Sequence, residues 1–163
     1  TPATVEKAIF AGGCFWGMEQ MFSRLKGVVK TKVGYCGGEM ENPKYEEVKR
    51  GNTGHAESIY IEFDDDIVKY GEMLDYFFTI HDPTTRNRQL GDIGSQYRSA
   101  IFYLDDYQRE EAIKAIERAK KKWKKEIVTD VVKFEKFWDA EEYHQKYLEK
   151  NPGGYTCHYE RKF

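Results

Sequence analysis

The chain has 163 residues, 40% hydrophobic and 33% charged, which predicts a single globular domain and excludes a collagen-like or disordered chain. Lys and Arg total 26 against 28 Asp and Glu, and the resulting net charge of −2 argues against a nucleic-acid binder. Three cysteines are too few for a disulfide scaffold, so we expect reduced thiols and a cytoplasmic protein. No apolar run reaches the length of a membrane helix and the first residues lack signal-peptide features, so we expect no membrane contact.

Strand and helix patterns alternate through the first half of the chain. Residues 7–11 form a short apolar run that ends at two glycines, which predicts a strand. From Phe15 the apolar residues recur with helical spacing, and the helix is expected to end at Gly27. Residues 28–35 predict a second strand. Residues 55–63 alternate in hydropathy and predict a third.

The second half continues the alternation. The predicted elements are a helix over 70–80, a strand over 98–104, a helix from Asp105 to the lysines at 120–125, a last strand over 131–134 and a short helix over 139–149. The order β-α-β-β-α-β is the split ferredoxin-like arrangement. We therefore predict an α+β fold, a two-layer sandwich with a ferredoxin-like split β-α-β core and helices on one sheet face. Residues 1–163 are expected to form one catalytic domain with a mobile tail from about residue 150.

Cys14 is the residue that most strongly suggests chemistry. It follows a strand and two glycines and precedes a helix, whose free N–H groups and dipole stabilise a thiolate; a buried structural cysteine is the alternative. Trp16 lies about 100° from the helix's apolar stripe and could wall a pocket, whereas Phe15 lies on the stripe. Glu57 is expected to face the core, where burial raises the pKa of a carboxyl and keeps it a proton donor; a strand-end glutamate that reaches solvent is the alternative.

The other thiols and histidines give weaker indications. Cys157 lies in a glycine-rich stretch suited to a resolving cysteine, and Cys36, at a strand end, is a bystander or a second candidate for that role. Residues 55–57 match the first half of the zinc deaminase signature, but its paired cysteines are missing. No His or Cys spacing predicts a metal site, so we expect neither metal nor cofactor.

Five motifs run in one order along nearly the whole chain. They are GCFWG at 13–17, GHAE at 54–57, HDPT at 81–84, GDIGSQYRS at 91–99, and HQ at 144–145 with LEKNP at 148–152. Together they resemble the A-type family of peptide methionine sulfoxide reductases. A single five-residue motif is fairly specific, and five blocks in order make the resemblance strong.

The resemblance implies a role for each candidate site residue. Cys14 would attack the sulfoxide sulfur, and a protonated Glu57 would hydrogen-bond the sulfoxide oxygen and give it a proton. The substrate-binding residues it implies are Phe15 and Trp16 around the S-methyl group, Tyr45 and Tyr97 at the oxygen, and Asp92, which orients polar groups and water.

The resemblance also implies a reaction sequence and partners. A sulfenic acid on Cys14 would condense with a second cysteine, expected to be Cys157, and thioredoxin or a similar dithiol would reduce the disulfide. The substrate would be the S epimer of methionine sulfoxide, free or in oxidised proteins, and we expect a monomer. Thr156 separates Cys157 from the Gly-Tyr pair that it directly follows in many relatives, so Cys36 stays open as the resolving cysteine.

Two other functions remain open at this point. A cysteine hydrolase or acyltransferase would use Cys14 with His55 or His144 and would need a ring nitrogen within hydrogen-bond reach of the thiol. A non-enzymatic, aromatic-rich peptide-binding module would be indifferent to the loss of Cys14.

Overall fold

The computed structural model describes residues 5–13, 15–38, 43–49, 54–85, 88–89, 92–145 and 150. Within them the chain forms one six-stranded sheet, a separate pair of short strands and four α-helices. The class is therefore α+β, as the sequence predicts. The expected tail from about residue 150 lies, apart from residue 150 itself, outside the described residues.

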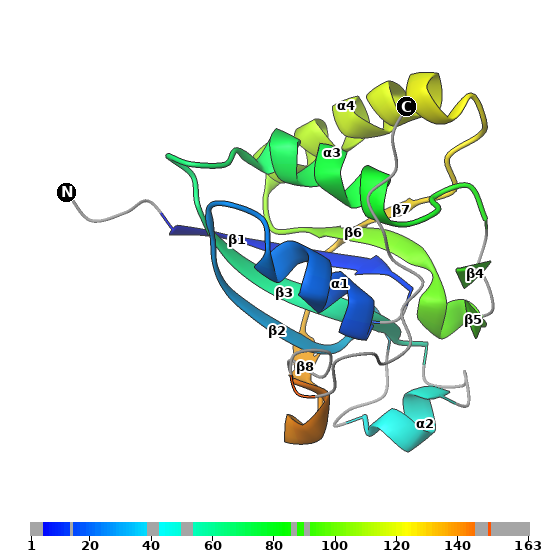
Figure 1. The fold of residues 1–163 in the computed structure, drawn as a ribbon. Coiled ribbons are helices and arrows are strands. Elements are labelled where there is room, and N and C mark those ends of the chain that lie inside the picture. The colour runs from blue at the N-terminus through cyan, green and yellow to red at the C-terminus, as the bar shows by residue number, and fades with distance from the viewer. Residues whose placement is uncertain are drawn as a thin grey trace.

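The main sheet has the strand order β7-β6-β1-β3-β2-β8 (Figure 1). Neighbouring strands are antiparallel except for the parallel pair β6 and β7. The strands are β1 (Val5–Gly12), β2 (Val28–Cys36), β3 (Ala56–Asp64), β6 (Ser99–Tyr103), β7 (Asp130–Lys133) and β8 (Phe137–Asp139). The separate pair consists of β4 (Arg88–Gln89) and β5 (Asp92–Ile93).

Three helices cover one face of this sheet, with α3 and α4 packed against each other and α1 beside them (Figure 1). The helices are α1 (Phe15–Ser23), α2 (Tyr45–Lys49), α3 (Tyr70–Ile80) and α4 (Asp106–Trp123), with 3-10 turns η1 (Ser95–Tyr97) and η2 (Glu142–His144). Asp105 caps the start of α4, since its side chain accepts a hydrogen bond from the backbone N–H of Gln108 at 2.9 Å.

Side-chain alternation along the strands divides the interior into two parts. Phe10 of β1 faces the helices, and its ring centroid lies 5.7 Å from that of Phe22 in α1 and 4.9 Å from that of Phe77 in α3. Ile9 faces the other way and joins a smaller buried cluster that includes Phe102. The helix-covered face thus holds the main core, which includes several buried aromatic rings.

The predicted elements differ from the observed ones mainly near the end of the chain. The expected strands and helices up to α4 are all present, with bounds shifted by a few residues. The expected last strand, β7, is followed by a further strand, β8, which pairs with β2. The helix expected over 139–149 is wrong for the described part of that range, because residues 142–144 form only one 3-10 turn.

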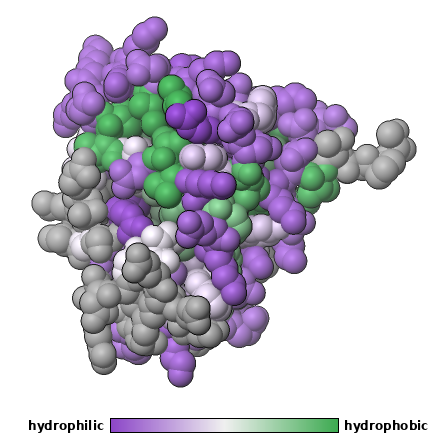
Figure 2. Space-filling view, turned by 180° about the vertical axis from the view of Figure 1, so that it is seen from behind, coloured by the Kyte–Doolittle hydropathy of each residue, from purple (hydrophilic) through white to green (hydrophobic). Residues whose placement is uncertain are grey.

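The face opposite the view of Figure 1 is largely polar. Figure 2 shows the back of the molecule as mostly hydrophilic, interrupted by a smaller hydrophobic area. Among the helices of the described ranges, none is both long enough and apolar enough to cross a membrane.

Candidate active site

Gly12 and Gly13, at the end of β1, are explained by two different structural constraints. A Cβ on Gly12 would lie 3.0 Å from the Phe77 ring and 3.1 Å from the His81 ring, so a side chain there would have to displace these rings by a few tenths of an ångström. Gly13 has φ +98°, a conformation that L side chains rarely adopt. The chain can therefore turn sharply from β1 towards α1 at this point.

The His81 ring packs next to Gly12, at that turn. Its ring is fully buried, with Nδ1 2.6 Å from the Phe77 carbonyl oxygen and Nε2 2.7 Å from the Ser99 hydroxyl. The Ser99 hydroxyl lies 2.7 Å from that of Thr129. The HDPT motif thus begins with a histidine that ties the end of α3 to β6.

Glu57 lies in β3 and is 1% exposed, facing the helix-covered side as the alternation predicts. Its Oε1 accepts a hydrogen bond from the backbone N–H of Phe15 at 3.4 Å, so the carboxyl lies at the first turn of α1. That N–H is one of the donors that a helix start leaves without an intrahelical partner. Tyr35 is the cross-strand neighbour of Glu57 on β2. The structure therefore brings a buried carboxyl to the residue that directly follows Cys14 in sequence.

Phe15, whose N–H binds this carboxyl, also belongs to an aromatic cluster. Phe15 is fully buried, and its ring lies 5.8 Å from Tyr35, 6.4 Å from Tyr45 and 5.2 Å from His144. Trp16 is partly buried and packs against the same cluster. Both aromatic residues expected beside the nucleophile, together with Tyr45, thus gather in one place.

The indole of Trp16 is fixed by a hydrogen bond, because its Nε1–H donates to His144 Nδ1 at 2.9 Å. This imidazole nitrogen must be unprotonated to accept. Burial lowers the pKa of His144, while the carboxylates of Glu141 and Glu46 oppose that effect. The Tyr45 ring covers the imidazole at 4.3 Å between centroids.

Tyr97 lies in η1, which packs against β3. The next residue, Arg98, donates a hydrogen bond from Nη2 to the Gly54 carbonyl oxygen at 3.0 Å, which ties η1 to the start of β3. Asp92 belongs to β5, and its side chain lies outside the description. The described part of residues 82–97 thus contains β4, β5 and η1.

The three cysteines differ in what the structure describes of them. Cys14 and Cys157 lie outside the described residues. Cys36, at the end of β2, is a free thiol with 1% exposure, and burial raises its pKa to about 12. Its hydrophobic neighbours belong to the cluster on the sheet face opposite the aromatic cluster.

Tyr35 and Glu141 also belong to the site, although the sequence did not single them out. The Tyr35 hydroxyl donates to Glu141 Oε1 at 2.8 Å, across 106 residues of sequence. Glu141 Oε2 accepts from the backbone N–H of Tyr45 at 3.1 Å, across 96 residues. Separations of this size leave no periodic signal in a single sequence, and the register that places Tyr35 opposite Glu57 is visible only in the folded sheet.

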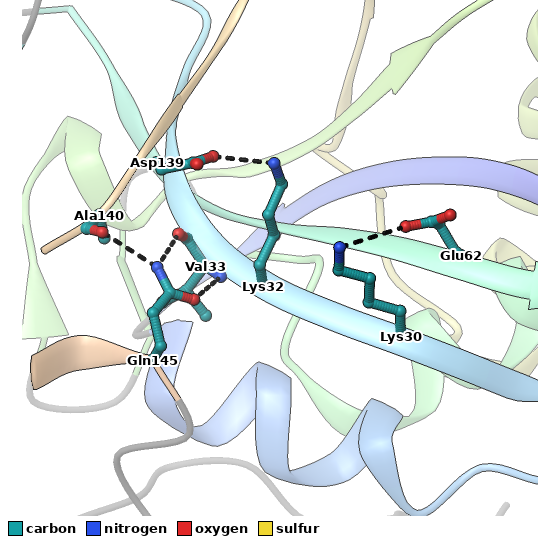
Figure 3. Close-up of polar contacts among 7 residues, drawn as sticks. All are labelled: Lys30, Lys32, Val33, Glu62, Asp139, Ala140 and Gln145. Carbon is teal, nitrogen blue, oxygen red and sulfur yellow. Dashed lines mark hydrogen bonds and ion pairs between the residues drawn. The ribbon is translucent and has the colours of Figure 1, made fainter. Parts of the chain in front are cut away.

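Gln145 extends the edge of the sheet beyond the end of β8. Its side-chain Oε1 accepts from the Val33 N–H at 2.9 Å, and its Nε2 donates to the carbonyl oxygens of Val33 at 2.9 Å and Ala140 at 3.0 Å (Figure 3). The ion pair between Lys32 and Asp139, 2.9 Å long, lies beside it. The HQ motif therefore supplies one residue to the aromatic cluster and one to the attachment of its segment.

Within the described ranges, no three His, Cys, Asp or Glu side chains are grouped in a way that could hold a metal ion. His55, considered above as a base, accepts a hydrogen bond at Nδ1 from the Gly38 N–H at 3.1 Å. His144 likewise uses its Nδ1 as an acceptor.

Comparison with known proteins identifies the family to which the chain belongs. The profile of the peptide methionine sulfoxide reductase family matches residues 6–163. The "Peptide methionine sulfoxide reductase MsrA" of Clostridium botulinum (strain Okra / Type B1) is 53% identical over 154 residues, covering 94% of this chain and 98% of that protein.

Solved structures agree. Mxr1 from Saccharomyces cerevisiae in its reduced form superposes with a TM-score of 0.93 at 40% identity, covering 99% of this chain and 95% of that chain. Mxr1 in complex with Trx2 gives a TM-score of 0.68 at 27% identity, covering 99% and 94%. The chain belongs to the peptide methionine sulfoxide reductase family, a family of oxidoreductases.

Proposed function

We propose that this protein reduces the S epimer of methionine sulfoxide, free or within oxidised proteins, to methionine. Membership of the family supports the substrate class. The observation that carries the proposal is the buried carboxyl of Glu57 at the backbone N–H of Phe15, the residue after Cys14. Sulfoxide reduction by a thiol needs a nucleophile, an acid for the oxygen and an apolar place for the methyl group, and these residues supply all three.

In the reductase step Cys14 is the nucleophile and Glu57 the acid. The Cys14 thiolate attacks the sulfoxide sulfur, the S–O bond breaks, and the oxygen passes to Cys14 as a sulfenic acid with a proton from Glu57. The substrate sulfur is reduced by two electrons and the cysteine sulfur is oxidised by two. Burial disfavours the charged form of a carboxyl, and a neutral acid can accept the Phe15 N–H at one oxygen while it carries its proton on the other.

Substrate binding combines an apolar wall with polar contacts to the oxygen. Phe15 and Trp16 enclose the S-methyl group, a contact favoured by burial and dispersion. Tyr45 and Tyr97 hydrogen-bond the sulfoxide oxygen, and Asp92 orients polar groups and water. The ring contacts among Phe15, Tyr45 and His144 support a shared apolar site.

A second cysteine then condenses with the sulfenic acid, forming a disulfide and releasing water. Cys157 is the proposed partner. The buried thiol of Cys36, with its pKa raised to about 12 by burial, is a poor nucleophile at neutral pH. Thioredoxin or a similar dithiol reduces the disulfide by exchange. The structure of a relative in complex with Trx2 supports this partner.

We also propose that residues 1–163 form one catalytic domain acting as a monomer, and that its core is the ferredoxin-like split β-α-β arrangement in a two-layer sandwich. The order β6-β1-β3-β2 with antiparallel neighbours supports that core. The three helices on one face support the two layers.

The test supplies each epimer of methionine sulfoxide separately, with thioredoxin, thioredoxin reductase and NADPH, and follows NADPH oxidation. We expect turnover with the S epimer only, and none with the Cys14→Ser variant. The Cys36→Ser variant is the matched control and should turn over like the wild type. Equal rates with both epimers, or full activity of Cys14→Ser, would contradict the proposal.

A further inference from the structure

The carboxylate of Glu141 joins two elements that are far apart in the sequence. One oxygen accepts from the Tyr35 hydroxyl of β2 at 2.8 Å, and the other accepts from the backbone N–H of Tyr45 at 3.1 Å. Burial raises the pKa of Glu141, but hydrogen bonds from its own backbone N–H, Tyr35 and Tyr45, with the nearby His144, hold it below its ordinary value. The side chain is thus an ionised acceptor with both oxygens in use.

The Tyr45 contact lies at the start of α2, a helix of only five residues. A helix this short cannot hold its conformation by its own hydrogen bonds and needs tertiary contacts. The N–H groups of its first turn have no intrahelical partner, and a negative charge there is favourable. Glu141 supplies both the acceptor and the charge.

The segment that carries Glu141 is itself attached to the sheet. The Ala140 N–H donates to the Val33 carbonyl oxygen at 3.0 Å, and the Gln145 amide bonds both backbone groups of Val33 (Figure 3). Glu141 therefore lies between two anchors to β2, the strand that pairs with β3 and brings Tyr35 opposite Glu57. Its carboxylate is therefore held in place relative to β2, and it binds the backbone N–H of Tyr45 at the start of α2.

We infer that Glu141 is a positioning residue of the active site: its carboxylate holds Tyr45 against β2 and thereby sets the place of the Tyr45 ring beside Phe15 and His144. The ring distances are 6.4 Å to Phe15 and 4.3 Å to His144. This inference rests on the proposed function, in which the Tyr45 hydroxyl binds the sulfoxide oxygen. Small displacements of such a group are expected to lower the rate, because the hydrogen bond must be aligned in the transition state.

The test compares Glu141→Gln with Glu142→Gln in the steady-state kcat/KM for reduction of methionine-S-sulfoxide to methionine. The neighbouring Glu142 side chain is 92% exposed and pairs only loosely with Lys150, at 3.9 Å, so it is the matched control. An amide has one acceptor oxygen where the carboxylate has two, so it cannot accept from both Tyr35 and Tyr45, and the negative charge at the start of α2 is lost. We expect kcat/KM to fall about ten-fold in Glu141→Gln and to stay within about two-fold of wild type in Glu142→Gln.

A double-mutant cycle separates positioning from a general loss of structure. Tyr45→Phe removes the hydroxyl on which the proposed effect depends, so Glu141→Gln should lower kcat/KM by less than about two-fold in that background. If the two losses multiply, or if Glu141→Gln behaves like Glu142→Gln, the inference is overturned. Should Glu141→Gln not fold, Glu141→Asp keeps the charge but not the reach, and the same ten-fold loss is expected.

Amide hydrogen exchange supplies a readout that does not depend on activity. The Tyr45 backbone N–H should exchange at least about ten-fold faster in Glu141→Gln than in Glu142→Gln, because a neutral amide is a weaker acceptor than the carboxylate. Equal exchange rates would overturn the inference even if the protein is an active reductase. If wild-type protein releases no methionine, the proposed function fails, and the exchange result alone decides whether Glu141 holds Tyr45.

Discussion

Two adjacent residues of β2 face two different interiors. Tyr35 faces the helix-covered side, where its hydroxyl bonds Glu141 and its cross-strand neighbour is Glu57. Cys36 faces the other side, in an apolar cluster with Ile9 and Phe102. Both side chains are almost fully buried. Burial alone therefore does not make a reactive site; the difference is the set of hydrogen-bonding partners that the chain brings to each face.

The alkylation rate of the Cys36 thiol tests this difference between the two faces most strongly. In a Cys14→Ser/Cys157→Ser variant, Cys36 is the remaining thiol of the three. Its pKa of about 12 leaves about one thiolate in ten thousand at pH 8, so alkylation should be about a thousand-fold slower than for an exposed cysteine. The same variant in urea is the control and should react at the ordinary rate. Native-state labelling within ten-fold of that rate would remove the distinction between the two faces.

The two buried glutamates Glu57 and Glu19 provide a second test, because only Glu57 is expected to act as an acid. Glu57→Gln should slow methionine release at least about a hundred-fold, because an amide cannot deliver the proton that the sulfoxide oxygen takes up. Glu19, in α1, is 2% exposed, and its Oε2 accepts from the Thr31 hydroxyl at 3.0 Å. Glu19→Gln should leave the rate within about two-fold, since the amide oxygen can still accept. Similar losses in the two variants would mean that burial, not acid catalysis, explains the effect.

His144 predicts a smaller, pH-dependent effect on stability. Burial lowers its pKa below the ordinary 6.5, with Glu141 and Glu46 opposing, so the unfolded chain binds more protons than the native one. The stabilisation is therefore present above about pH 6.5 and is lost as the pH falls towards the lowered native value. In His144→Asn the amide oxygen can replace Nδ1 as acceptor for Trp16, and no proton is taken up.

Urea unfolding at pH 7.5 and 5.5 measures this. The free energy of unfolding of wild type should fall more between the two pH values than that of His144→Asn. The other three histidines are the same in both proteins and drop out of the difference. An identical fall in wild type and variant would contradict the assigned role of a neutral His144.

The smallest expected effect is that of the Tyr35 hydroxyl. Tyr35→Phe removes one donor to Glu141 but leaves the Tyr45 contact, so we expect a loss of about 1 kcal/mol in stability and a fall in kcat/KM of two- to three-fold. Tyr107→Phe is the matched control, because that tyrosine is 58% exposed at the start of α4. A loss in Tyr35→Phe larger than that in Glu141→Gln would mean that the two contacts are ranked wrongly.

Helices and strands were predicted well where residues close in sequence determine them, and missed where contacts with distant residues do. The helix over 70–80 was predicted with its observed bounds because its apolar spacing is regular and its buried residues, such as Met73 and Phe77, lie one turn apart. α2 was missed because five residues show no period and its first N–H is held by Glu141, 96 residues away. β8 was missed because it is three residues long and exists through its pairing with β2.

The residues of the candidate site were likewise predicted only in part. The resemblance implied that Phe15, Trp16, Tyr45 and Glu57 share one site. In the structure Phe15, Trp16 and Tyr45 belong to one hydrophobic cluster, and Glu57 accepts a hydrogen bond from the Phe15 N–H. The chemical roles of these residues, and of Cys14, Asp92, Tyr97 and Cys157, stay predictions, as do the cytoplasmic location and the monomeric state. The parts that sequence reasoning missed, Tyr35 and Glu141, are joined by side-chain contacts that only the folded chain creates.

The most direct test of the central claim gives the fully reduced enzyme methionine-S-sulfoxide with no external reductant. The products are then counted, and the cysteines are mapped by mass spectrometry. We predict about one methionine released per chain, a disulfide between Cys14 and Cys157, and Cys36 recovered as a free thiol. A disulfide that contains Cys36 would contradict the proposed division between the two faces of the sheet, and the absence of any methionine would contradict the proposed function itself.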